Sequence, residues 1–520
     1  MDKKWWALIA VCLGTFMLLL DITIVTVAQP AIQHGLHASF SDVQWTLDAY
    51  ALTLASLLLT SGVLADRYGR KRLFAIGLTI FTLGSLLCGV AQNPLMIILS
   101  RCGQGIGGAI VFAVSLALLG NSFRGKDRGT AFGVWGAVTG IAVAAGPVLG
   151  GLITTDWNWR GIFLVNIPIG VFALAVTLWR VEESRAPHPA RPDWAGFGLL
   201  TAGLIGLIYG LIRASETSWT DVWVLTCLAA GIALLAAFAV AETRIANPML
   251  DLRLLRVPTF AGGSISAFAM NGSLYAMLLY LVIYLQDILG YSALAAGLRV
   301  SVITLATLVT ATAAGRLSER MPVRWLIGPG LLLVGIGLIV MAGLTGTSSW
   351  THLVPGFLIA GFGTGMVNPP LASTAIGVVP PHEAGMASGA NSTFRQVGIA
   401  TGIAALGSIF VSQMQSRLTS ALPPPLAGSA GTIAAAVRQG SVGHVLASVP
   451  AADRAATVLA IRSSFASGLN DLLYITAAVA LAGGLCALLL IRSKDFVKRE
   501  PAAPETAGAA DSAASAPVRT

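Results

Sequence analysis

The chain has 520 residues, of which 55% are hydrophobic and only 11% are charged, and its mean hydropathy is +0.79. A water-soluble surface needs more polar residues than this, so a soluble globular protein is excluded and lipid is the expected solvent. The net charge of +9 would suit a nucleic-acid partner if the basic residues were clustered, but they lie between apolar runs. No nucleic-acid partner is therefore expected.

Apolar windows of roughly 17 to 25 residues predict membrane-spanning helices. Fourteen such spans lie at 5–27, 46–66, 73–93, 95–119, 128–153, 161–180, 194–212, 222–241, 259–287, 292–316, 325–345, 352–376, 384–412 and 468–491. With a cytoplasmic amino terminus, 23 Lys and Arg residues fall on the cytoplasmic side and seven on the outer side. Because basic residues concentrate in cytoplasmic loops, this asymmetry places both termini in the cytoplasm.

Two sequence patterns recur at nearly the same interval, which indicates an internal duplication. The run Gly62–Arg70 is echoed by Gly315–Arg324 at an offset of 253 residues, and Gly129–Gly133 is echoed by Gly385–Gly389 at 256. Parallel duplication is typical of transporters whose halves rock around a midplane site. The expected organisation is an N-terminal six-helix bundle at 1–180, two additional spans with cytoplasmic linkers at 181–258, a C-terminal six-helix bundle at 259–491 with a long outer loop at 413–467, and a disordered cytoplasmic tail at 492–520.

The first span carries an acid, Asp21, within the run Leu20–Pro30. An ionisable residue at membrane depth costs roughly 2.5–3.5 kcal/mol on insertion scales, so it should face the bundle interior or a water-filled cavity. Desolvation there favours the protonated acid, and Asp21 could therefore load and release a proton as its access alternates. An acid that is paired only to stabilise packing is the alternative interpretation.

The junction after the second span, Gly62–Arg72, combines glycines, an acid and several cations. Gly62 would permit close contact between helices, while Asp66 and Arg70, at i and i+4, can pair and approach the ends of neighbouring helices. A plain basic anchor at the membrane surface is the alternative. It would explain the cations but not the glycines or the acid.

The fourth span contains the polar run Leu99–Ala109, with Arg101 at membrane depth. Its glycines satisfy the dinucleotide fingerprint G-x-G-x-x-G, but they lie inside a long apolar run with no preceding strand, so a nucleotide site is excluded. A membrane-embedded arginine demands a partner, and Asp21 is the obvious candidate. A purely structural role for Arg101 remains the alternative.

The fifth span carries small residues at four-residue spacing, Gly136 and Gly140, followed by Gly146–Gly151. Small residues at this spacing allow tight packing between membrane helices, and Pro147 permits a kink. The sixth span follows with the run Trp159–Gly170.

In their order along the chain, these motifs resemble those of the major facilitator superfamily, and within it the fourteen-span drug:proton antiporters. The resemblance covers nearly the whole chain outside the outer loop and the tail, although Thr26, Gln29 and Gly161 replace the usual Asn, Leu and Trp. It implies an all-α integral membrane protein of the major facilitator fold, with two pseudo-symmetric six-helix bundles and two linking helices. It further implies proton coupling by Asp21 and Arg101, a cytoplasmic gate motif of Gly62, Asp66, Arg67, Gly69 and Arg70, and an antiporter motif of Gly136, Gly140, Gly146, Pro147, Gly150 and Gly151.

The implied function is proton-driven efflux of lipophilic small molecules, cations among them, by alternating access across a bacterial inner membrane. The expected partners are protons, a small-molecule substrate and the lipid bilayer, and the chain is expected to be a monomer without cofactor or metal. Candidate residues for the substrate cavity are Gln29, Asp48, Tyr50, Gln104, Asn166, Tyr280, Asp287 and Arg395.

Three other functions compete with this one. Export of one dedicated metabolite, such as an antibiotic, a siderophore or a lipid precursor, is the alternative within transport. A membrane-embedded enzyme is disfavoured because the six histidines are scattered through loops or near their borders. A receptor that transports nothing would leave the duplicated halves and the membrane acid unexplained.

Overall fold

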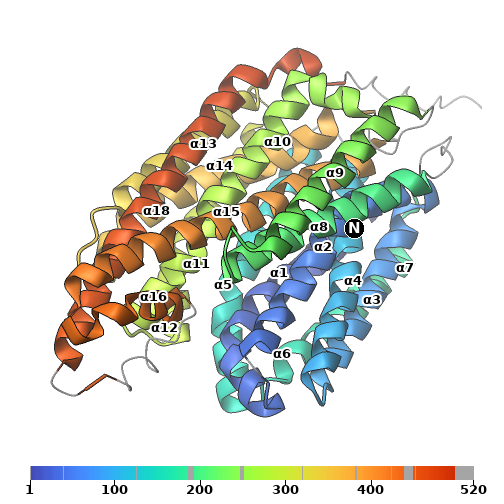
Figure 1. The fold of residues 1–520 in the computed structure, drawn as a ribbon. Coiled ribbons are helices and arrows are strands. Elements are labelled where there is room, and N and C mark those ends of the chain that lie inside the picture. The colour runs from blue at the N-terminus through green and yellow to red at the C-terminus, as the bar shows by residue number, and fades with distance from the viewer. Residues whose placement is uncertain are drawn as a thin grey trace, which may run out of the picture.

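The computed structural model describes residues 2–38, 40–123, 126–185, 193–245, 251–318, 320–380, 383–422, 424–438, 449–450 and 453–497. The regular elements of these ranges are helices (Figure 1). The N-terminal half consists of α1 (Lys3–Leu36), α2 (Phe40–Tyr68), α3 (Arg70–Gly89), α4 (Pro94–Ser122), α5 (Lys126–Asp156), the short α6 (Gly161–Leu164) and α7 (Asn166–Arg180).

Two long helices, α8 (Trp194–Glu216) and α9 (Val222–Arg244), follow this half and lie across the front of the molecule in Figure 1. α8 packs on both α2 of the first half and α15 of the second. The C-terminal half consists of η1 (Leu252–Arg256), α10 (Pro258–Met270), η2 (Asn271–Tyr275), α11 (Ala276–Ile283), η3 (Tyr284–Ile288), α12 (Ala293–Leu317), α13 (Arg324–Met341), η4 (Trp350–Leu353), α14 (Val354–Gly377), α15 (Ala384–Ala421), η6 (Pro424–Ser429), α16 (Ala430–Arg438), α18 (Arg454–Leu490) and η7 (Ser493–Asp495).

Within the described ranges, thirteen helices are long and apolar enough to cross a membrane. α14 has 24 residues and stands at the place of the fourteenth expected span, where it packs against α12 and α13. It contains several glycines, Asn368 and two prolines, and it is not one of the thirteen. The predicted all-α membrane architecture is confirmed, and the fourteenth crossing depends on α14.

The segment expected to be a long outer loop, 413–467, is helical at both ends. α15 continues to Ala421, and α18 begins at Arg454. The end of an apolar window marks where the chain leaves the hydrocarbon core of the bilayer. A helix can continue beyond that point, because its backbone hydrogen bonds form within the helix itself. Arg417 of α15 pairs with Asp471 of α18 at 2.6 Å, which ties the two helices together.

The tail expected at 492–520 begins with ordered residues. Thr259 Oγ1, at the start of α10, donates a hydrogen bond of 2.7 Å to Asp495 Oδ2 in η7. The remainder of the predicted tail, from residue 498 onward, lies outside the described residues.

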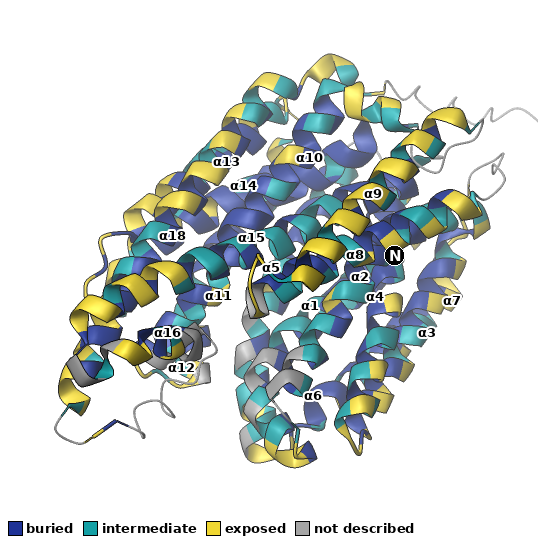
Figure 2. Ribbon diagram, viewed as in Figure 1, coloured by how far each residue is buried: buried dark blue, intermediate teal, exposed yellow. Residues whose placement is uncertain are grey.

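Each half buries an apolar core of its own, and a third core lies where the halves meet. The third core joins Leu59 of α2, Leu204 of α8 and Ala390 of α15. The helix faces that turn toward one another are buried, whereas the outward faces of α3, α9 and α13 are exposed (Figure 2). Large apolar side chains such as Trp223 (68% exposed) and Leu489 (74%) lie on the outside, as expected of a surface that contacts lipid.

We call the end of the bundle that carries Lys4, Lys71 and Arg492 the basic end. There the duplicated motifs meet crosswise, α2 against α15 and α5 against α12. A Cβ at Gly62 would overlap the carbonyl oxygen of Gly385, and a Cβ at Gly315 would lie 2.5 Å from the carbonyl oxygen of Gly129. These glycines allow the backbones of the two halves to touch.

Candidate functional site

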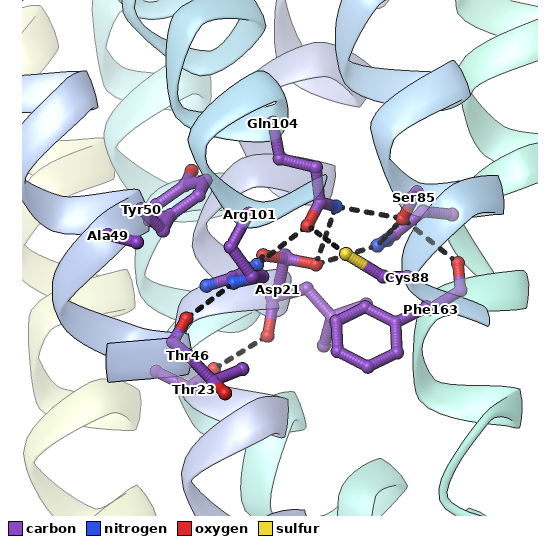
Figure 3. Close-up of polar contacts among 12 residues, drawn as sticks. Asp21, Thr23, Thr46, Ala49, Tyr50, Ser85, Cys88, Arg101, Gln104 and Phe163 are labelled. Atoms are coloured by element: carbon purple, nitrogen blue, oxygen red, sulfur yellow. Dashed lines mark hydrogen bonds and ion pairs between the residues drawn. The ribbon is translucent and has the colours of Figure 1, made fainter. Parts of the chain in front are cut away.

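Asp21 of α1 and Arg101 of α4 form a buried ion pair inside the N-terminal half. Each is no more than 1% exposed. Nη1 of Arg101 donates a hydrogen bond to Oδ2 of Asp21 (Figure 3). Leaving one of these charges buried without the other would cost about 3–5 kcal/mol, so each residue accounts for the presence of its partner at membrane depth.

Two amide side chains and a hydroxyl complete the surroundings of the Asp21 carboxylate. Oδ1 accepts hydrogen bonds from Gln104 Nε2 at 3.2 Å and from Asn166 Nδ2 at 3.0 Å. Both amides also donate to Ser85 Oγ, each at 2.9 Å, and Gln104 Oε1 accepts from Arg101 Nη1 at 2.9 Å. The carboxylate therefore has a cation on one oxygen and two amide donors on the other, so both of its oxygens have polar partners.

α2 holds the remaining side of the Arg101 guanidinium. The Nε of Arg101 donates to the backbone carbonyl of Thr46 at 2.9 Å, and the central carbon of its guanidinium lies 4.2 Å from the centroid of the Tyr50 ring. Three of the expected cavity residues, Tyr50, Gln104 and Asn166, thus surround the Asp21–Arg101 pair. Sequence reasoning missed Ser85 and Thr46, because a serine and a backbone carbonyl carry no signal of their own in an apolar run.

The expected gate motif connects the two halves at the basic end. Asp66 Oδ1 accepts hydrogen bonds from Arg70 Nε at 3.0 Å and Nη2 at 2.6 Å, and both residues are buried. The same carboxylate accepts from the backbone N–H groups of Gly385 and Met386, each at 3.0 Å. Those groups open α15, so Asp66 caps a helix of the other half, where its charge is favourable. Arg67, the remaining cation of this motif, is half-buried.

The turn from α2 to α3 requires a glycine. Gly69 has φ +109°, a conformation that L side chains rarely adopt, and a Cβ there would lie 2.7 Å from the Glu183 carboxylate. Glu183 accepts from the backbone N–H groups of Lys71 at 3.0 Å and Arg72 at 3.2 Å, which open α3. The acid that stabilises this helix start was not anticipated from the sequence.

The glycines of α5 form contacts in three directions. Gly136 faces α14 and Gly140 faces α12, both across the boundary between the halves. Gly146 faces α1, where a Cβ would overlap Oγ1 of Thr23, two residues beyond Asp21. Of the rest of the motif, Gly150 is buried, Gly151 is half-buried, and the side chain of Pro147 is not among those described.

The other cavity candidates differ in how they are placed. Tyr280 packs in the core of the C-terminal half, and its hydroxyl donates to the carbonyl of Ile403 at 3.2 Å. Gln29 of α1 and Asp48 of α2 are half-buried. The side chain of Asp287 is not among those described.

Arg395 of α15 has amide partners. Its Nε donates to Asn391 Oδ1 at 3.2 Å and its Nη1 to Asn368 Oδ1 at 3.3 Å. The sequence placed Arg395 within a span and indicated no partner for it. Asn368 belongs to α14, so the contact depends on packing between two helices that pattern alone does not specify.

The comparisons with known proteins agree with this architecture. The model of the Major Facilitator Superfamily matches residues 11–403. The chain is 35% identical to the multidrug resistance protein Stp of Mycobacterium tuberculosis over 81% of this chain and 79% of that protein. It is 31% identical to the tetracenomycin C resistance and export protein of Streptomyces glaucescens over 94% and 91%.

A solved structure shares the fold at much lower sequence identity. The human organic anion transporter MFSD10 superposes with a TM-score of 0.61 at 14% identity, covering 94% of this chain and all of that one. The duplicated motifs, the buried ion pair and the match over most of the length agree with one another. This chain therefore belongs to the Major Facilitator Superfamily of membrane transporters.

Proposed function

We propose that this protein is a proton-coupled efflux transporter that exports lipophilic small molecules by alternating access. The observation that carries the proposal is the Asp21 carboxylate, fully buried at membrane depth and held by Arg101 and two amides. A carboxylate in such a place is expensive and is commonly part of a proton pathway. The relatives that are named for multidrug resistance and for export support the direction of transport.

In the proposed cycle, protonation of Asp21 removes the charge that holds Nη1 of Arg101. The arginine and the two amides then lose their common acceptor, and the contacts between α1, α4 and α7 change. Gly146 of α5 packs against Thr23 of α1, so a movement of α1 reaches the helix that borders the other half. Loss of the proton to the cytoplasm would restore the ion pair and reset the cycle.

The proposed orientation follows from the distribution of charge. Basic residues concentrate on the cytoplasmic side of membrane proteins, so the basic end and both termini face the cytoplasm of a bacterial cell. The contacts of Asp66 with α15 then belong to a state that is closed toward the cytoplasm. We further propose a monomer with six-helix units at 1–180 and 259–491, joined by the two helices of 181–258.

Export of a single dedicated metabolite is the second candidate function. One observation favours it: the relative that matches 94% of this chain is named for resistance to and export of one compound, tetracenomycin C. A screen of chemically diverse compounds against a strain without its own efflux pumps separates the two candidates. Protection against several unrelated compounds supports multidrug export, and protection against one supports the dedicated exporter.

Proton coupling is tested with purified protein in liposomes under an imposed pH gradient. Uptake of ethidium, a lipophilic cation, is measured for the wild type, Asp21→Asn and Asp471→Asn. Asp471 is the matched control, because it also pairs with an arginine but is about one-third exposed. We expect gradient-driven uptake by the wild type and the control, and loss of that uptake in Asp21→Asn, because an amide cannot carry the proton.

Two results would contradict the proposal. One is uptake that is the same with and without the gradient. The other is an Asp21→Asn variant that folds normally, as judged by its melting temperature, and still responds to the gradient like the wild type.

A further inference from the structure

The C-terminal half contains a cation at membrane depth whose hydrogen-bonding partners are uncharged. Arg395 is bonded to the amides of Asn391 and Asn368, and its Nη2 is buried and makes no hydrogen bond within the described part of the chain. Arg101, the membrane-embedded cation of the other half, is paired with Asp21. Arg395 as a whole is half-buried, and a guanidinium with a buried donor to spare favours an anion beside it.

The surroundings of Arg395 form a built site with contributions from three spans. Asn368 accepts from Arg395 through its oxygen and donates from Nδ2 to the hydroxyl of Tyr275 at 3.2 Å, so its amide is fixed in orientation. Tyr275 ends the π-helical turn η2, and Asn368 directly precedes two prolines inside α14. Irregular turns of this kind in membrane helices are typical of binding sites at the midplane.

Arg395 also lies on the side of α15 that faces the N-terminal half. Ser388, two turns earlier, donates from Oγ to the carbonyl of Ala113 in α4 at 2.6 Å. Residues three and four positions apart share a helix face, which places Ser392 and Arg395 on that side. The hydroxyl of Ser392 is buried and makes no hydrogen bond within the described part of the chain.

The position along α15 places Arg395 well inside the bilayer. The helix begins at Ala384, and eleven residues at about 1.5 Å each put Arg395 roughly 16 Å from that end. The hydrocarbon core is about 30 Å thick, so this is near its middle and far from lipid headgroups. In Figure 1, α15 runs beside α8.

We propose that Arg395, oriented by Asn368 and Asn391, binds the anionic group of transported molecules, and that amphiphilic organic acids are a substrate class of this protein. The planar guanidinium fork suits a carboxylate or a sulfonate. Tyr275 and Ser392 supply further hydroxyls for the same group. This inference rests on the proposed export function and adds organic acids to its expected cargo, which the resemblance gives as lipophilic small molecules, cations among them.

The inference is tested by equilibrium dialysis of the purified full-length protein in detergent against three radiolabelled probes. Naphthoate, naphthamide and naphthylmethylammonium share one ring system and carry a negative, a neutral and a positive group. Binding is measured for the wild type, Arg395→Gln, Arg395→Lys and Arg299→Gln, with protein-free micelles as the blank. Arg299 is the matched control: an arginine of the same half that stacks on Tyr291, with its central carbon 3.6 Å from the ring centroid.

We expect the wild type to bind naphthoate more tightly than naphthamide. Arg395→Gln should weaken naphthoate binding about tenfold and leave naphthamide binding within about twofold, because only the charge-assisted contact is lost. Arg395→Lys should retain the preference for the anion, and Arg299→Gln should behave as the wild type. Equal binding of all three probes by the wild type, or an unchanged preference in Arg395→Gln, would overturn the inference.

This experiment separates the inference from the proposed function, because it needs no gradient. A preference for naphthoate that depends on Arg395, together with transport that ignores the pH gradient, would uphold the anion site and refute proton coupling. Gradient-driven transport, together with equal binding of the three probes, would uphold proton coupling and refute the anion site.

Discussion

At the scale of single residues, the charged side chains at membrane depth have different kinds of partner in the two halves. Asp21 is held by a cation and two amides, whereas Arg395 has only amides. Within the described residues, one half therefore contains a cation paired with an acid, and the other contains a cation whose hydrogen-bonding partners are uncharged. We therefore propose different ligands for the two sites, a proton on the carboxylate of Asp21 and an anion directly on Arg395.

The contribution of the Asn166–Asp21 hydrogen bond to stability should depend on the charge of Asp21, and this dependence can be measured. Asn166→Ala should lower the free energy of unfolding by about 1.5–3 kcal/mol, because the lost bond goes to an ionised group. In an Asp21→Asn background the same change should cost clearly less. The measurement is a double-mutant cycle on the unfolding free energies of the purified proteins, and purely additive costs would refute the assigned coupling.

At the scale of elements, glycines determine how closely the helices and turns can approach. Gly62 and Gly315 permit backbone contact between the halves, and Gly69 permits a turn that no other residue adopts readily. These roles differ physically, because the first is a question of space and the second a question of backbone conformation. Substitutions can distinguish them.

Gly69→Ala should destabilise the protein by about 1–3 kcal/mol, because φ +109° is strained for any L side chain. Gly103→Ala is the matched control. Gly103 lies inside α4, a Cβ there meets nothing within 4 Å, and replacing a helical glycine by alanine is worth up to about 1 kcal/mol of stabilisation. Melting temperatures of the two variants should therefore move in opposite directions, and equal shifts would count against the strained turn.

The spans and the Asp21–Arg101 pair could be predicted from the sequence because the bilayer leaves few choices. An acid and a cation in apolar helices each need a polar partner, so the presence of one predicts a contact with the other. Contacts that carry no such cost could not be predicted. Asp66 caps α15 across 319 positions of sequence, and the donors are backbone N–H groups, which every residue type provides. The sequence also underestimates the lengths of α15 and α18. Hydropathy shows which residues lie in hydrocarbon, but it does not show where a helix ends.

At the scale of the whole molecule, the duplicated halves are joined by reciprocal seams. The first motif of the N-terminal half packs on the second motif of the C-terminal half, and the reverse holds for Gly315 and Gly129. Asp66 anchors the α2–α15 seam, and the corresponding acid of the other seam, Glu319, lies outside the described residues. α8 covers the α2–α15 seam with apolar side chains and so shields it from lipid.

The strength of the Asp66 contact should be measurable as a shift in the population of states. Asp66→Asn removes the charge that faces both Arg70 and the start of α15, an interaction worth about 1–2 kcal/mol at a helix N-terminus. If the closed basic end depends on this contact, the open state should gain roughly five- to thirtyfold in relative population. Apolar packing of the seam would remain, so the variant should fold.

The measurement is the distance between spin labels at Tyr68 and Leu317, in a background without the five native cysteines. Both positions are exposed, at 44% and 43%, and they lie at the basic end in opposite halves. Pulsed electron paramagnetic resonance should show a longer-distance population that grows in Asp66→Asn and not in the Asp471→Asn control. Because the Asp66 carboxylate bonds the start of α15, an unchanged distance distribution would mean that this contact does not hold the basic end closed.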